Sequence, residues 1–136
     1  MDVDEARSFL REHHRAVLAT SRSDGRPQMS PVMAAVDDEG YVVISSREPA
    51  FKVVNLRRDP RASLVAFTID FYGGWVQVDG PAHLVSLPEA MDHLIHYYQA
   101  VSGEHPDWDE YRQAMEDQRR VVIRIAIEHA GPDRHR

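Results

Sequence analysis

The chain has 136 residues, 43% of them hydrophobic and 28% charged, and this size and mixture predict a single globular domain over residues 1–136. Its formal net charge of −6 argues against a nucleic-acid partner, and the lack of cysteine excludes a disulfide framework and thiolate ligands or nucleophiles. No apolar run approaches the ~20 residues of a membrane span, and the acidic N-terminus has no signal-peptide pattern, so we expect a cytoplasmic protein that does not bind membranes.

The first part of the chain predicts one short helix and then a meander of strands. The helix is expected over residues 3–14, where apolar positions fall on one face. The strands are expected over residues 16–20, 28–37 and 41–45, with turns at Asp24-Gly25 and at residues 37–40. Pro31 lies inside the second strand and predicts an edge position or a bulge, because proline cannot donate to the sheet ladder.

The second part of the chain predicts further strands with two helices inserted late. Strands are expected over residues 62–69, 75–85 and 121–130, with Gly73-Gly74 as a hairpin turn. One helix is expected between Ser86, as its N-cap, and Gly103, and a second over residues 106–120. The polar tail over residues 131–136 is expected to be mobile.

The short connections between neighbouring strands favour antiparallel pairing, because parallel strands need a crossover of helical length. We therefore predict a mainly β (α+β) fold with about six strands. The expected architecture is a small barrel or curled sheet with helices on its flanks.

A basic stretch, "SSREPAFKVVNLRRDPRASL" over residues 45–64, is unusual in this acidic chain. Ser45, Ser46 and Arg47 end a predicted strand, Pro49 marks the expected start of a helix, and Lys52 falls in its first turn. Helix N-termini present free N–H groups and a partial positive charge. These donors, together with the two hydroxyls and two cations, predict a pocket for a phosphate or another anion.

Other interpretations of the same stretch remain open. Arg57, Arg58 and Arg61 fall near the C-terminus of the helix, where cations interact favourably with the helix dipole. Lys52 could instead extend its ammonium into solvent. The buried face of this helix is predicted to carry Phe51 and Val54, with Asn55 or Leu56 as a further member.

Several segments resemble a known family when they are taken in order. They are "GRPQMSPV", "SSREPAFKVVNLRRDPRASL", "WVQVDG", "GEHPDWDEYRQAM" and "RRVVIRI". Together they resemble the split β-barrel proteins of the pyridoxamine 5'-phosphate oxidase-like superfamily. Within it, they are most similar to the small actinobacterial oxidoreductases that use the deazaflavin coenzyme F420. The resemblance runs from about Ala16 to Ile127 and implies a six-stranded antiparallel split β-barrel.

The resemblance also implies a cofactor site at the interface of a homodimer. The residues implied at the cofactor phosphate are Ser45, Ser46, Arg47 and Lys52, with Ala50 and Phe51 lining the same turn. The residues implied along the deazaflavin ring are Gln28, Met29, Ser30, Pro31 and Val32. Trp75 matches a position where an aromatic side chain packs near the cofactor, although it could equally be an anchor of the dimer interface. Arg120 or Arg119 is implied to reach the site of the partner subunit.

The activity that the resemblance implies is hydride transfer between reduced F420 and a small organic substrate, and no catalytic residue is assigned. Two alternatives stay open: an FMN-dependent oxidoreductase on the same fold, and a non-catalytic protein that binds or carries F420. No tryptophan follows Trp108, whereas pyridoxamine phosphate oxidases carry a C-terminal motif with tryptophan and arginine. This departure argues against pyridoxamine phosphate as the substrate. His93 and His96 are expected to be surface histidines, and no metal site is predicted.

Overall fold

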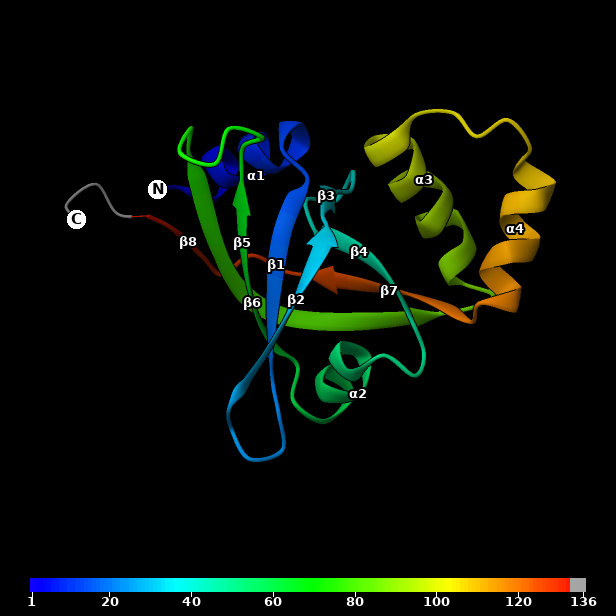
Figure 1. The fold of residues 1–136 in the computed structure, drawn as a ribbon, viewed down its shortest axis with the longest axis horizontal. Coiled ribbons are helices and arrows are strands. Elements are labelled where there is room, and N and C mark those ends of the chain that lie inside the picture. Colours follow the sequence, from blue (N-terminus) through cyan, green and yellow to red (C-terminus); the bar gives the residue numbers. More distant parts are fainter. Residues whose placement is uncertain (133–136) are drawn as a thin grey trace.

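The computed structural model describes residues 1–132 and forms four helices and eight strands from them (Figure 1). In chain order these are α1 (Val3–Glu12), β1 (Arg15–Ser21), β2 (Pro27–Met33), β3 (Ala35–Val36), β4 (Val42–Arg47), α2 (Phe51–Arg58), β5 (Arg61–Phe67), β6 (Trp75–Ser86), α3 (Ala90–Ser102), α4 (Trp108–Asp117), β7 (Arg120–Ile125) and β8 (His129–Gly131). Residues 133–136 of the tail that was expected to be mobile lie outside the described residues.

All the strands form one antiparallel sheet. Its path is β2-β1-β5-β6-β7-β4-β3, with β8 beside β6. The two ends of this path, β2 and β3, are consecutive in the chain, and only Ala34 separates them. The sheet therefore curls until its edges approach each other, which gives a split barrel with flanking helices. The predicted fold class is confirmed, and β2 is an edge strand, as Pro31 indicates.

The number of strands is larger than expected because two predicted strands are each divided. The segment over residues 28–37 breaks at Ala34, whose N–H donates to the His14 carbonyl (2.8 Å), so that β2 pairs with β1 and β3 pairs with β4. The segment over residues 121–130 breaks after Ile125 and resumes as β8. Both halves of this last segment pair with β6.

The second division occurs where the chain passes directly over Gly80 of β6. A Cβ at Gly80 would lie 1.7 Å from the Ala126 carbonyl oxygen, so only glycine fits here. Hydrogen bonds on either side hold this crossing: Ala126 N–H donates to the Pro81 carbonyl (3.0 Å) and Glu128 N–H to the Asp79 carbonyl (2.9 Å). The twelve-residue β6 thus pairs with β5 and β8 along its first part and with β7 along its second.

Two apolar cores share the strands β4 and β7. The first fills the curl of the sheet and includes Leu18, Ile44 and Leu64. The second lies between these strands and the helices α3 and α4, which stand together on one side of the molecule (Figure 1); Val43 and Leu94 belong to it. Burial on both faces explains why the first half of β4, Val42 to Ile44, is a continuous apolar run rather than an alternating one.

The helix boundaries differ from the predictions at two N-termini. Ser86 does not cap a helix; it is the last residue of β6, its hydroxyl donates to Glu48 Oε1 (3.0 Å), and α3 begins only at Ala90. Gly103 ends α3 with a φ of 82°, as predicted. At α2, Pro49 lies in the turn before the helix, whose N-cap is Ala50.

The predicted buried face of α2 is partly wrong. Phe51 and Val54 are 76% and 49% exposed, whereas Asn55, Leu56 and Val53 are buried. Val53 and Leu56 pack in the first apolar core, and a polar contact supports the same orientation: Asn55 Nδ2 donates to the Thr20 hydroxyl of β1 (3.1 Å). Phe51 and Val54 therefore face the outside of the molecule.

None of the helices that residues 1–132 form has the length and apolar character needed to span a bilayer.

Candidate functional site

The basic stretch folds as the end of β4, a tight turn and the first turn of α2. Ser45, Ser46 and Arg47 end the strand, and Lys52 is the second residue of the helix. This order of strand, turn and helix is the predicted one. Arg61, by contrast, is not part of the helix end; it begins β5 and forms an exposed ion pair with Asp59 (2.7 Å).

A cavity of about 210 Å³ lies at this junction, where three distant segments meet. Its lining comes from β2, from the β4–α2 turn and from the start of β7. The lining residues are Pro31, Val32, Met33, Ser45, Ser46, Arg47, Ala50, Lys52 and Arg120. The structure therefore brings together eight of the thirteen residues that sequence reasoning placed at the site, and it adds Met33. Arg120 is among the eight, but it lines the cavity of its own chain, whereas the resemblance implied that it reaches the site of the partner subunit.

Three cations share this small space. Arg47 and Arg120 are direct partners across the antiparallel pair β4–β7, an arrangement that destabilises a sheet when the charges are alike. The Arg120 guanidinium also lies 3.5 Å from the Ser45 hydroxyl. Burial, and then the positive charge of Arg120, lower the pKa of Lys52 below its usual value. An anion in the cavity would relieve both kinds of repulsion.

The protein does not supply that anion from the described residues. No Asp or Glu of residues 1–132 is among the residues that line the cavity. Glu48, the carboxylate nearest in sequence, forms an ion pair with Arg57 and accepts the Ser86 hydroxyl instead. Lys52 lines this cavity and is only partly exposed, which favours its interpretation as a residue of an anion pocket over one in which its ammonium extends into solvent.

The N-terminus of α2 adds backbone N–H donors next to the cavity. Asp2 caps α1 and Asp107 caps α4, each by accepting a backbone N–H of the first turn. At α2 the N-cap is Ala50, which has no side-chain acceptor, and the first turn contains no acidic residue. The free N–H groups of this turn favour an anion.

Four of the predicted site residues lie away from this cavity. Met29 and Phe51 are 63% and 76% exposed, and Gln28 lies near Thr20 of β1 at 3.5 Å between their side-chain oxygens. Trp75 lines a separate cavity of about 460 Å³ with Val65 and aromatic residues of the β5–β6 hairpin. None of these four residues lines the cavity, so a ligand would contact them only by extending beyond it.

Ser30, the remaining predicted residue, lies on β2 between Gln28 and Val32. Its hydroxyl oxygen is buried and has no hydrogen-bond partner among the described residues. An orphaned buried hydroxyl is rare in folded proteins and marks a position where a further polar group is expected.

Tyr97 of α3 is a site residue that the sequence did not indicate. Its hydroxyl donates to the Met33 carbonyl (2.8 Å), so it supports β2 at the cavity wall. Burial raises the pKa of Tyr97, against opposing effects of the Ser45 backbone and the Arg120 charge. Both Tyr97 and the neighbouring Tyr98 pack against the second apolar core, so no local signal in the sequence separates the role of Tyr97 from that of Tyr98.

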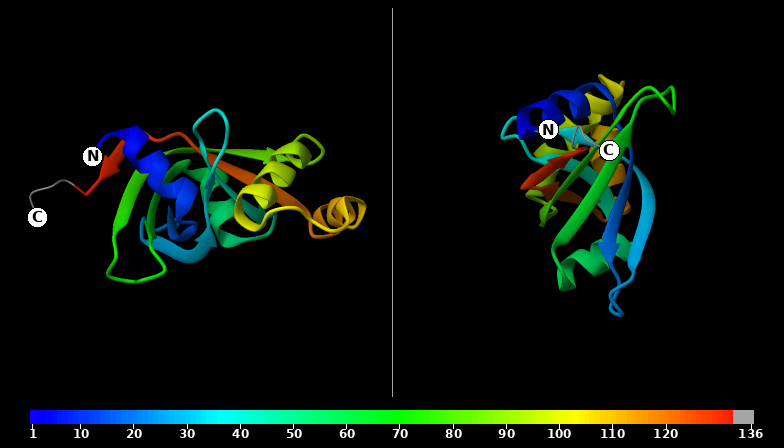
Figure 2. Two further views of the ribbon diagram at one scale, coloured as in Figure 1. Left: turned by 90° about the horizontal axis from the view of Figure 1, so that it is seen from above. Right: turned by 90° about the vertical axis from the view of Figure 1, so that its left-hand side faces the viewer.

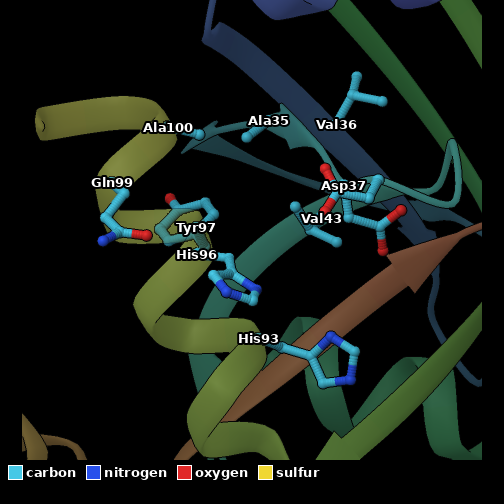
Figure 3. Close-up of a pocket in the computed structure, with 10 residues that line it drawn as sticks. Ala35, Val36, Asp37, Val43, His93, His96, Tyr97, Gln99 and Ala100 are labelled. Atoms are coloured by element: carbon cyan, nitrogen blue, oxygen red, sulfur yellow. The ribbon is translucent and has the colours of Figure 1, made fainter.

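A second cavity, of about 220 Å³, lies between α3 and the turn after β3. Figure 3 shows the rings of His93 and His96 extending from α3 into this space, on the side of Asp37. Asp37 is held by a salt bridge to Arg124 (2.9 Å) and accepts the backbone N–H of Tyr41 (2.9 Å). Within residues 1–132, no three His, Cys, Asp or Glu side chains are grouped so that they could hold a metal ion.

Comparison with known proteins identifies the fold family. The profile of the pyridoxamine 5'-phosphate oxidase family matches residues 3–131. The chain belongs to this family. The resemblance stated from the sequence segments is thereby confirmed.

Solved structures of similar fold have names that refer to different cofactors or to none. A conserved hypothetical protein of Mycobacterium tuberculosis is 28% identical, with a TM-score of 0.78 over 96% of this chain and 82% of that chain. An F420 reductase is 20% identical, with a TM-score of 0.69 over 91% of this chain and 94% of that chain. The heme storage protein HutZ of Vibrio cholerae is 18% identical, with a TM-score of 0.70 over 96% and 94%. Similarity at these lower identities establishes the split barrel, not the ligand.

Proposed function

We propose that the chain is an oxidoreductase that binds coenzyme F420 and transfers a hydride between the reduced deazaflavin and a small organic substrate. The observation that carries this proposal is the cavity in which Arg47, Lys52 and Arg120 meet two serine hydroxyls without a carboxylate from the described residues. Its volume of about 210 Å³ suits a phosphate group with its linker rather than a whole cofactor. The similarity to an F420 reductase supports the choice of cofactor.

In this arrangement different residues bind different parts of the cofactor. Lys52, Arg47 and Arg120, with the free N–H groups of α2, bind the phosphate of the tail. The edge strand β2 holds the ring through its main-chain groups. When bound, reduced F420 supplies the hydride, so the protein has mainly to orient the two reactants and exclude water.

A second copy of the chain completes the site in this proposal. Exposed apolar side chains lie on β2 (Met29 and Met33) and at the start of β6 (Trp75), and the β5–β6 hairpin projects beyond the sheet (Figure 2). Ile69, Phe71 and Tyr72 of this hairpin are 80%, 68% and 91% exposed. So many exposed apolar groups on one face mark an interaction surface. A homodimer through this face would cover β2 and enclose the ring and the substrate.

The test is a titration of the purified protein with F420, followed by the fluorescence of the cofactor. We expect saturable binding in the micromolar range, weakened at least tenfold in Lys52→Met, since one charged hydrogen bond is lost. Arg61→Met is the matched control: it removes a cation that the structure places outside the cavity. Absence of F420 binding at high micromolar concentration contradicts the proposal.

Parallel titrations distinguish the two alternatives. Tight FMN binding without F420 binding, or a yellow protein from a host that lacks F420, supports an FMN-dependent oxidoreductase on the same cavity. Tight F420 binding without oxidation of reduced F420 by a broad set of enones, quinones and tetrapyrroles supports a carrier. Analytical ultracentrifugation tests the dimer, which Tyr72→Asp is expected to weaken.

A further inference from the structure

A larger cavity, of about 590 Å³, lies on the other side of Arg120 from the phosphate-sized one. It opens between α4, the turn that follows β6 and the turn that follows β4. One wall is apolar and consists of Leu87, Pro88 and Met91. The opposite wall carries arginine side chains. Of the predicted cofactor contacts, only Arg120, with Arg119 as its stated alternative, lines this cavity, and the exposed face of the sheet does not account for it.

The charges around this cavity are predominantly positive. Arg112, Arg119 and Arg120 line it, against two carboxylates, Glu48 and Glu116. Glu48 is already engaged by the Arg57 guanidinium and the Ser86 hydroxyl. Arg112 pairs with Asp109 (3.5 Å) and Arg120 Nε donates to Gln118 Oε1 (2.8 Å), but each guanidinium has further N–H donors for an anion that enters from outside.

The backbone at Arg119 supports the same interpretation. Its φ is 52°, the left-handed region that usually falls to glycine at the end of a helix. The conformation is fixed on both sides, because Arg119 N–H donates to the Glu116 carbonyl (3.1 Å) and its own carbonyl accepts Glu48 N–H (3.0 Å). An arginine in place of the favoured glycine is explained if its side chain has a use. Arg119 lines the larger cavity but not the smaller one. We therefore infer that its side chain serves the larger cavity.

We propose that this cavity binds a carboxylate on an apolar body. The apolar part packs on Leu87, Pro88 and Met91, and the carboxylate is held by Arg119 with Arg112 or Arg120. This division between an apolar wall and a few convergent polar groups is typical of small-molecule sites. The inference does not depend on F420, because the cavity and its arginines are formed by the chain itself.

The position of Arg120 couples the two cavities, because its side chain lines both. An anion in either cavity interacts with the same Arg120 guanidinium, and two neighbouring anions repel each other. An anion bound in one cavity therefore weakens the binding of an anion in the other. By thermodynamic linkage, each ligand lowers the affinity for the other by the same factor.

The first experiment uses the full chain and octanoate as the probe, with octan-1-ol as its uncharged counterpart, in isothermal titration calorimetry. Octanoate is expected to bind and octanol to bind several-fold more weakly. Arg119→Gly is the decisive variant, because glycine favours the local backbone and loss of the fold cannot explain its effect. It should weaken octanoate binding by roughly fivefold or more, the scale of one charged contact at a partly exposed site. Arg61→Gln should leave it unchanged.

The second experiment tests the coupling with inorganic phosphate as the competitor. Phosphate should reduce the apparent affinity for octanoate in the wild type, and the reduction should disappear in Lys52→Met, which lacks a cation of the smaller cavity only. Absence of saturable octanoate binding, equal binding of octanol, or an Arg119→Gly variant that binds like the wild type overturns the proposal. These experiments involve no F420. A negative result would therefore leave the proposed function intact, and a failure of F420 binding would leave this inference intact.

Discussion

Replacement of Lys52 by methionine separates the stability of the chain from its binding function. In the folded protein the pKa of Lys52 is lowered, first by burial and then by the charge of Arg120, so its ammonium is less favourable there than in the unfolded chain. Methionine keeps the apolar part of the side chain and removes this charge. Because the side chain is still partly solvated, the gain in unfolding free energy at pH 7 should be small, about 0.5 kcal/mol.

The effect of the same substitution on anion binding should be larger and of opposite sign. Lys52 shares the cavity with two arginines and two serine hydroxyls, so an anion there loses one of its charged hydrogen bonds in the variant. Such a bond contributes about 1.5–3 kcal/mol, which corresponds to roughly 10- to 150-fold in affinity for a phosphate-bearing ligand.

The pH dependence of unfolding provides an independent check. A lysine with a lowered folded pKa destabilises the protein fully at neutral pH, and this penalty disappears as pH rises through that lowered pKa toward the ordinary lysine value. The difference in urea stability between wild type and Lys52→Met should therefore shrink in this alkaline window. Arg61→Met, measured in parallel, should change neither stability nor binding appreciably. A variant that is less stable at pH 7, or that binds anions as well as the wild type, would refute the reasoning.

Three further substitutions test other parts of the structure. Gly80→Ala brings a methyl group to 1.7 Å from the Ala126 carbonyl oxygen and should lower urea stability by about 2–4 kcal/mol; a change below the error of the measurement would contradict the crossing. Asn55→Ala removes the buried hydrogen bond to Thr20 and should lower the free energy of unfolding, measured by thermal denaturation, by about 1–3 kcal/mol. An unchanged unfolding free energy would contradict this role of the bond. Although burial raises the pKa of Asp79, hydrogen bonds from Ser63 and other side chains lower it overall, so its contribution to stability is present above the ordinary Asp pKa and is lost as pH falls through the lowered value. Asp79→Asn should flatten this acid limb of the stability profile, and an unchanged limb would exclude Asp79 as its source.

Local patterns sufficed for most of the elements and for the centre of the site. The strand-length runs of β1 and β5, the turn residues and the one-sided apolar positions of α1 all act within a few positions. The same holds for the junction of β4 and α2, where Ser45, Arg47 and Lys52 are placed by one strand end and one helix start. Arg120 entered only through the resemblance, since nothing local indicates that β7 pairs with β4.

The features that the sequence did not reveal depend on contacts between distant segments. The division of the last strand requires the passage of Ala126 over Gly80, and the orientation of α2 is supported by Thr20 of β1. Tyr97 joins the site because α3 packs against the end of β2. Apolar periodicity alone therefore assigned Phe51 to the wrong face and gave Tyr97 no role.

The junction of β2, β4 and β7 also has a consequence for how the chain acquires its ligand. Hairpins such as β1–β2 and β5–β6 join sequence neighbours and can form early, whereas Arg47 and Arg120 become neighbours only when segments more than half the chain apart have paired. The positively charged cavity therefore does not exist on the ribosome until β7 has been synthesised. A ligand of this cavity can bind only chains in which β4 and β7 have paired. It therefore stabilises the folded chain relative to partly folded intermediates.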